Sequence, residues 1–196
     1  MTKSSKNIIN MVIAAFFLAL ALVLPFLTAQ VPTVGKMLCP MHLPVFLCAY
    51  FCGPFYALVV GIIAPLLRML LFGMPNFLTA IPMCFELAAY GFFAGILYKK
   101  LPKKNVYIYV SLIAAMILGR IVWGIAKAVL VGLGAIDFGF KAFIVEGFVT
   151  ALPGIALQIV VVPLLVIALR GVVVHSHDDG TVHMHLHGDE PHKHDK

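Results

Sequence analysis

Six apolar runs, separated by short polar stretches, follow one another along the first 170 residues of the chain. Most hold about 20 mainly apolar residues, the length that an α-helix needs to cross the hydrocarbon core of a bilayer. The pattern therefore predicts an all-α integral membrane protein with six transmembrane helices. The runs lie at about residues 7–27, 37–52, 55–72, 78–98, 106–131 and 143–169.

The second run is the shortest, and it contains Pro40 and Pro44 before it breaks at Gly53 and Pro54. Because proline removes a helical hydrogen bond and clashes with the preceding turn, we expect this span to be irregular or tilted.

Orientation follows from the basic residues. A short loop, KKLPKKN, holds four lysines between residues 99 and 104, and basic residues in short loops stay in the cytoplasm. With six spans, the N-terminal Lys3 and Lys6, this loop and Arg170 all fall on one side. The sequence therefore predicts a multi-pass plasma-membrane protein with both termini in the cytoplasm.

Composition agrees with a lipid environment. The chain is 62% hydrophobic and 11% charged, with a mean hydropathy of +1.05, whereas an ordinary soluble domain is about 45–50% apolar and about 25% charged. The net charge of +6 comes from residues at the ends of apolar runs, so it indicates membrane topology, and we expect no nucleic-acid partner. No two of the four cysteines form a CxxC motif. This favours a role for them as apolar packing residues over a disulfide framework or a structural zinc site.

Two domains are expected: a membrane domain over residues 1–171 and a polar, disordered cytoplasmic tail over residues 172–196. The tail holds seven of the eight histidines, and His183, His185 and His187 alternate within it. Imidazoles at this density bind Zn, Ni or Cu with modest affinity. The tail is therefore either a solvated segment that attracts metal ions or a metal-buffering, regulatory element.

Candidate binding residues come from the charged and polar side chains within apolar runs, which are costly there and normally functional. Glu86 is the first of these. Arg120, Trp123 and Lys127 have the spacing i, i+3, i+7, which places them on one helical face. A guanidinium, a stacking surface and an ammonium together suit a small organic anion. The predicted substrate-binding residues are Arg68, Glu86, Arg120, Trp123, Lys127 and His42.

Structural alternatives stay open for several of these residues. Arg120 could pair with Glu86 to hold two helices together, Lys127 could extend to the membrane interface, and His42 could be interfacial. Three cations nevertheless face two acids in the outer half of the membrane, and one positive charge is left over. An anionic ligand would neutralise it. The cations are Arg68, Arg120 and Lys127, and the acids are Glu86 and Glu146.

Small residues four apart, Ala15 and Ala19 in the first run and Gly91 and Gly95 in the fourth, could each let another helix approach closely. Such pairs are also common by chance in apolar segments.

The order of these segments resembles the substrate-binding S components of energy-coupling factor (ECF) transporters. The resemblance covers about residues 7–170. It rests on the short N-terminal arm followed by AFFLALALVLP, PMHLPVFLCAYFCGPFYALVVG, APLLRMLLFGMP, FELAAYG and LGRIVWG.

This resemblance implies a six-helix, S-component (RibU-like) fold whose outer-half cavity binds a vitamin or metal ion. It also implies docking on a transmembrane T component through Ala15 and Ala19, and ATP hydrolysis by two cytosolic ATPase subunits. The chain itself lacks the phosphate-binding motif GxxxxGK[ST], so we expect it to bind no cofactor and to have no enzymatic activity.

The substrate expected is a vitamin-like, carboxylate-bearing molecule, for example a pantothenate-type or folate-type compound. S components for nickel or cobalt begin with a Met-His signature, whereas this chain begins Met-Thr-Lys-Ser. The alternative is a metal-ion importer subunit, or a metal-regulated transporter, that uses the His-rich tail. A membrane enzyme with Glu86 as acid or base and Arg120 as substrate clamp is a third hypothesis, but no nucleophile or second catalytic carboxylate accompanies Glu86.

Overall fold

The computed structural model describes residues 3–28, 38–102, 104–136 and 139–170, and these residues are helical throughout apart from short turns. The predicted all-α membrane fold is confirmed, whereas the histidine-rich tail predicted for residues 172–196 lies outside the described residues. The elements are α1 (Lys3–Val23), the 3-10 helix η1 (Leu24–Thr28), α3 (His42–Phe51), α4 (Pro54–Phe72), α5 (Phe77–Lys100), α6 (Asn105–Gly132), α7 (Phe140–Ile144), the π-helix η2 (Val145–Val149) and α8 (Leu152–Arg170).

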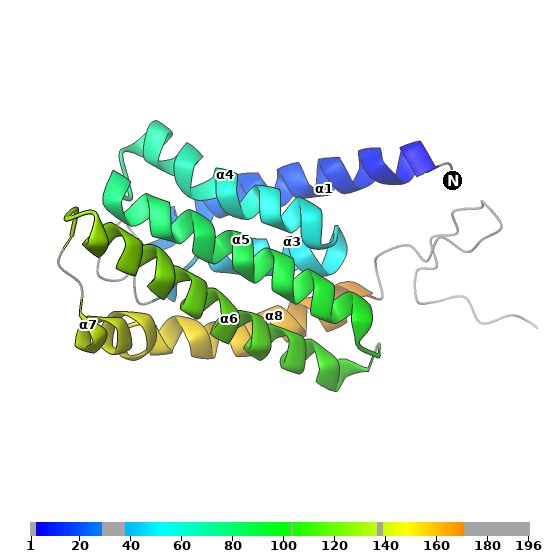
Figure 1. Ribbon diagram of the computed structural model, residues 1–196. Helices are drawn as coiled ribbons and strands as arrows, with labels where there is room; N and C mark the ends of the chain where they lie inside the picture. The colour runs from blue at the N-terminus through cyan, green and yellow to red at the C-terminus, as the bar shows by residue number, and fades with distance from the viewer. Residues whose placement is uncertain (1–2, 29–37, 103, 137–138, 171–196) are drawn as a thin grey trace, which may run out of the picture.

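Helices run back and forth along one long axis (Figure 1). The described N-terminus, the connection from α5 to α6 and the end of α8 lie at one end, and the turns after α4 and α6 lie at the other. Among the described residues, five helical segments are long and apolar enough to cross a membrane. The alternation of direction agrees with the prediction that the lysine loop and the two ends of the membrane domain share a side.

α3 is much shorter than the five segments that can cross a membrane. It has ten residues, and at 1.5 Å per residue it covers about 15 Å, half of the hydrocarbon core. It is nevertheless central, because eight of its residues are buried. The irregular span expected from Pro40 and Pro44 is therefore a short buried helix that ends at Phe51. Gly53 follows it with a φ of 97°, which favours glycine.

α4 and α5 pack closely because glycines remove the side chains between them. A Cβ on Gly61 would lie 2.6 Å from the backbone of Leu87, and one on Gly91 would lie 2.7 Å from the backbone of Ala57. Gly95 approaches Pro54 in the same way. The predicted close approach at Gly91 and Gly95 is confirmed, and its partner is α4.

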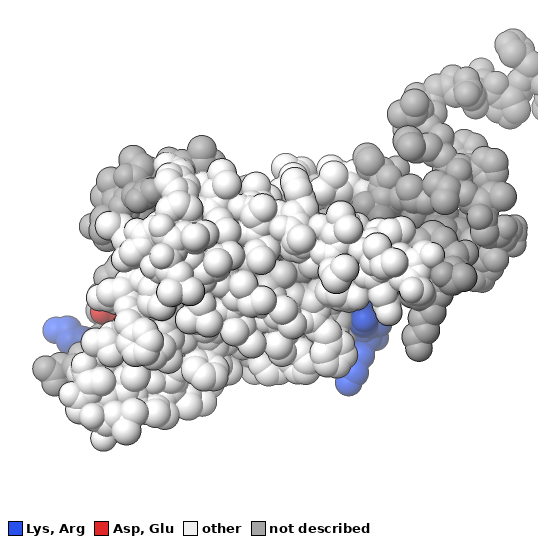
Figure 2. All heavy atoms as spheres, turned by 90° about the horizontal axis from the view of Figure 1, so that it is seen from above, with Lys and Arg blue, Asp and Glu red and all other residues white. Residues whose placement is uncertain are grey.

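Charged side chains gather at the two ends of the long axis in the view of Figure 2, and the described surface between them shows no acidic or basic side chain on this face. Large apolar side chains such as Leu70, Phe55 and Val160 are exposed to the surroundings. An apolar belt with charged ends is what a bilayer requires of a spanning helical bundle.

Candidate substrate-binding site

A buried polar cluster joins α3, α5 and α6 around Glu86, whose side chain is only 4% exposed. Arg120 Nη1 lies 2.8 Å from Glu86 Oε1, and the hydroxyl of Tyr90 donates a hydrogen bond of 2.7 Å to the same oxygen. His42 Nε2 lies 3.7 Å away from it. The structure therefore brings His42, Glu86 and Arg120 together, and the ion pair considered above as a helix tie is present.

Tyr90 belongs to this cluster although the sequence did not single it out. It lies one turn after Glu86 on α5, so its ring reaches back along the same face. The ring rests directly on α6, because a Cβ on Gly119 would be 2.2 Å from Tyr90 Cδ1 and Cε1. Gly119 in the segment LGRIVWG was the available signal, since a glycine inside a helix indicates a close approach by a neighbouring group.

His42 is held by the backbone carbonyl of Cys39, three residues before it. The carbonyl of Cys39 accepts hydrogen bonds from the His42 backbone nitrogen, at 3.0 Å, and from Nδ1, at 3.1 Å. Cys39 has φ of 47°, a left-handed conformation that is uncommon for a residue with a side chain. The imidazole also lies 5.2 Å, centroid to centroid, from the Tyr90 ring. Its position is therefore fixed from both α3 and α5.

On α6, Trp123 lies one turn after Arg120, toward the end of the bundle that holds α7. Arg120 Cζ and Lys127 Nζ lie 5.8 and 5.4 Å from the Trp123 ring, within the range of cation–π attraction. The predicted common face of Arg120, Trp123 and Lys127 is confirmed. Lys127 Nζ also lies 3.6 Å from Glu146 Oε2.

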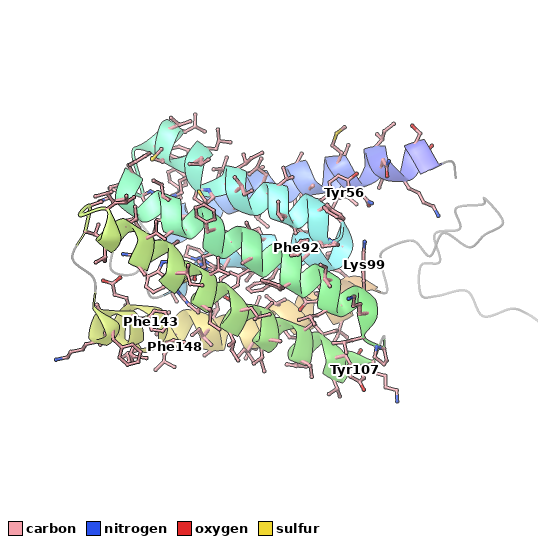
Figure 3. All side chains as sticks on the ribbon, viewed as in Figure 1. Tyr56, Phe92, Lys99, Tyr107, Phe143 and Phe148 are labelled. Atoms are coloured by element: carbon pink, nitrogen blue, oxygen red, sulfur yellow. The ribbon has the colours of Figure 1, made fainter. Side chains whose placement is uncertain are left out.

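Phe143 of α7 covers the indole, with its ring 6.0 Å from that of Trp123 and inclined by 29°. Gly124 makes room for it, because a Cβ there would lie 2.4 Å from Phe143 Cε2. Glu146 and Gly147 lie in the π-helix, a form that is frequent at functional sites. Figure 3 shows Phe143 and Phe148 at the end of the bundle opposite Lys99 and Tyr107. If the lysine loop is cytoplasmic, as the sequence predicts, this end is the outer one.

Arg68 lies elsewhere. It is buried, its Nη1 donates to the carbonyl of Leu22 at 3.1 Å, and its guanidinium lies 5.5 and 5.7 Å from the rings of Phe26 and Phe72. Pro25 lacks the amide hydrogen that a 3-10 turn would direct at Leu22, so Arg68 supplies a donor where α1 gives way to η1. Within the described segments Arg68 forms no ion pair, and the structure does not connect it with the Glu86 cluster. The extra positive charge is therefore on Arg68, since Arg120 and Lys127 both face acids.

Ala15 and Ala19 are both exposed on α1. Their neighbours Ala14 and Phe17 face the core instead. The two alanines therefore present a strip of small side chains outside the bundle, as a docking surface would require.

The histidines proposed as a weak metal site, His183, His185 and His187, lie outside the described residues. Within residues 3–28, 38–102, 104–136 and 139–170 no three His, Cys, Asp or Glu side chains are grouped closely enough to hold a metal ion. None of the four cysteines forms a disulfide.

Comparison with known proteins assigns the chain. Residues 10–166, which include the whole Glu86 cluster, match the family described as ECF transporter, substrate-specific component. No curated protein and no solved structure matches the chain. The match spans most of the sequence and reaches every long helix that the structure describes, so the chain is a multi-pass membrane protein that belongs to the ECF transporter substrate-specific component family.

Proposed function

We propose that this subunit binds a small, vitamin-like organic anion at the Glu86 cluster, in the outer half of the membrane. The observation that carries the proposal is the Arg120 side chain, which is only 7% exposed yet lies between Glu86 and Trp123. A buried cation beside an aromatic surface can hold a carboxylate through the donors that Glu86 leaves unused. Pantothenate-type and folate-type compounds are the starting candidates.

Lys127 supports the same assignment. Its partner Glu146 is half exposed, and their 3.6 Å separation is long for an ion pair of this type. A pair this loose contributes little, and we propose that Lys127 also faces the substrate carboxylate. Trp123, stacked on Phe143 and lying between the two cations, would then form an aromatic wall beside the organic part of the substrate.

Transport requires partners, because members of this family work with a T component and ATPase components. We propose that one T component and two cytosolic ATPase subunits complete the importer and that the ATPases alone use ATP. This chain then acts as the high-affinity binding subunit and has no catalytic role.

Binding of a defined panel tests the substrate class. We expect the purified subunit in lipid nanodiscs to bind one of the radiolabelled acids pantothenate, folate or biotin, and to bind neither the cationic vitamin thiamin nor Ni²⁺ or Co²⁺ through its membrane domain. A chain without residues 175–196 is the control, since it removes metal binding by the tail. High-affinity binding of a metal ion by that shortened chain, with no acid bound, would overturn the proposal in favour of metal import.

Docking is predicted to occur at the small-residue strip on α1. Replacing Ala15 and Ala19 together with leucine should prevent close helix approach and abolish uptake, while substrate binding to the isolated subunit changes less than about twofold. Leucine at the neighbouring exposed position Phe16 is the matched control and should leave uptake intact. Normal uptake by the double variant would exclude this surface.

Topology gives a separate prediction. A cysteine at Asn105, beside the lysine loop, should be protected from a membrane-impermeant maleimide added outside intact cells, because the positive-inside rule places this loop in the cytoplasm. A cysteine at Lys141, an exposed position on α7, should react. The opposite labelling pattern would invert the orientation and place the Glu86 cluster in the inner half.

A further inference from the structure

His42 carries a nitrogen whose hydrogen-bonding capacity is unused. The side chain is 3% exposed, and within the described part of the chain its Nε2 has no hydrogen-bond partner. The nearest carboxylate oxygen is Glu86 Oε1, at 3.7 Å. A buried polar atom normally finds a partner, so this atom needs an explanation.

The other ring nitrogen determines what Nε2 can do. Nδ1 lies 3.1 Å from the carbonyl oxygen of Cys39, and a carbonyl oxygen only accepts, so Nδ1 must carry a hydrogen. In a neutral imidazole the second nitrogen then has a lone pair and no hydrogen. Nε2 is in that case an acceptor that lies beside another acceptor, the Glu86 carboxylate.

Geometry favours this neutral form over the imidazolium. A charged Nε2–H facing a carboxylate would form a bond of about 2.7–2.9 Å, whereas the separation is 3.7 Å. Tyr90 and Arg120 do approach the same oxygen, at 2.7 and 2.8 Å. Arg120 already balances the charge of Glu86, so a second buried cation would be uncompensated.

Two acceptors 3.7 Å apart define the place of one donor, because a single donor atom can lie about 2.8–3.0 Å from both. The Nε–H of Arg120 is the complementary case, a buried donor without a partner among the described residues. Among the described residues, the cluster therefore has an acceptor without a donor, His42 Nε2, beside a donor without an acceptor, Arg120 Nε.

We infer that the substrate carries a hydroxyl or N–H group that donates a hydrogen bond to His42 Nε2, beside the Glu86 carboxylate and next to the acidic group held by Arg120. This inference rests on the proposed function and narrows its substrate class to carboxylic acids that bear a nearby hydroxyl, amide or other N–H donor. His42 is then a specificity residue that selects against acids without such a donor.

The backbone supports this role for His42. Both hydrogen bonds that orient its backbone and its ring are accepted by the carbonyl of Cys39, and Cys39 holds that carbonyl in place with φ of 47°. Strained conformations of this kind cluster at ligand sites, where they fix a contact in advance. These hydrogen bonds place Nε2 beside Glu86.

The tautomer can be measured without any substrate. In the full chain in nanodiscs with ring-¹⁵N-labelled histidine, the His42 signals are those lost in His42→Gln. We expect Nδ1 to be protonated and Nε2 unprotonated at neutral pH. Two protonated ring nitrogens, or a hydrogen on Nε2 alone, would overturn the inference.

The selectivity is tested with matched acids and three variants. Pantothenate, folate and biotin carry hydroxyl or N–H donors in addition to a carboxylate, whereas lipoate and nicotinate carry a carboxylate but no hydroxyl or N–H donor. We expect the parent protein to bind an acid of the first group and neither of the second.

His42→Leu removes the acceptor and His42→Lys replaces it with a donor, so each should weaken binding of that acid about 10- to 100-fold. His42→Gln, whose carbonyl can accept, should stay within about fivefold of the parent. Binding of lipoate or nicotinate as tight as that of the donor-bearing acid, or binding by His42→Leu within twofold of the parent, would show that a water or nothing fills this position and would overturn the inference alone. If no acid binds, the proposed function fails, and the inference fails with it.

Discussion

Arg120→Ala is expected to weaken binding of the acid that the parent protein selects by about 2 to 5 kcal/mol, the range found when one member of a buried charged pair is removed. The variant loses the donors proposed to hold the carboxylate, and it leaves Glu86 buried with only Tyr90 as a close donor. Isothermal titration calorimetry on the purified subunit measures the change.

Glu86→Gln and Lys141→Ala complete that experiment. Glu86→Gln keeps the size of the side chain but removes the charge that orients Arg120, so we expect a loss of similar sign. Lys141→Ala removes an exposed cation of the same end of the bundle and should change affinity by less than about 0.5 kcal/mol. If Arg120→Ala and Glu86→Gln both bind as tightly as the parent, the pair is only a tie between α5 and α6.

Gly61→Ala should destabilise the folded subunit by about 1 to 3 kcal/mol or more, because the added methyl group overpacks the α4–α5 contact. The new Cβ would lie 2.6 Å from backbone atoms of Leu87 and Ala88, and a backbone cannot move aside as a flexible side chain can. Thermal unfolding in detergent, followed by gel filtration of the soluble fraction, gives the change in midpoint.

Gly132→Ala is the matched control for this prediction. It is also a helical glycine, at the end of α6, but a Cβ there would meet nothing within 4 Å. Since alanine is the better helix former by about 1 kcal/mol, this variant should be as stable as the parent or slightly more so. Equal stability of Gly61→Ala and Gly132→Ala would mean that α4 and α5 do not pack as closely as described.

Features that depend on one helix were predictable from the sequence. The spacing of Arg120, Trp123 and Lys127 places them on one face whatever surrounds them, and an intramembrane Glu86 requires a partner for energetic reasons alone. The Glu86–Arg120 ion pair was therefore among the alternatives that the sequence left open, and it is what the structure contains.

Features that depend on contacts between elements were not predictable in the same way. His42 and Glu86 are far apart in sequence, and only the fold brings the α3 turn against α5. Arg68, like Arg120, is an arginine within an apolar run. Its Nη1 nevertheless donates to the carbonyl of Leu22, because the end of α1 lies beside it. Hydropathy also treats the last apolar run as a single span, whereas a π-helix separates α7 from α8.

Native mass spectrometry can detect the substrate bound beside Arg120 without identifying it before the experiment. The parent subunit and Arg120→Ala would be purified from the same membranes, transferred intact into the gas phase, and their bound small molecules released and identified. We expect an organic acid with a hydroxyl or N–H donor to accompany the parent at close to one molecule per chain and to be largely absent from Arg120→Ala. A parent subunit that carries only lipid or a metal ion, or an acid retained equally by both proteins, would contradict this expectation.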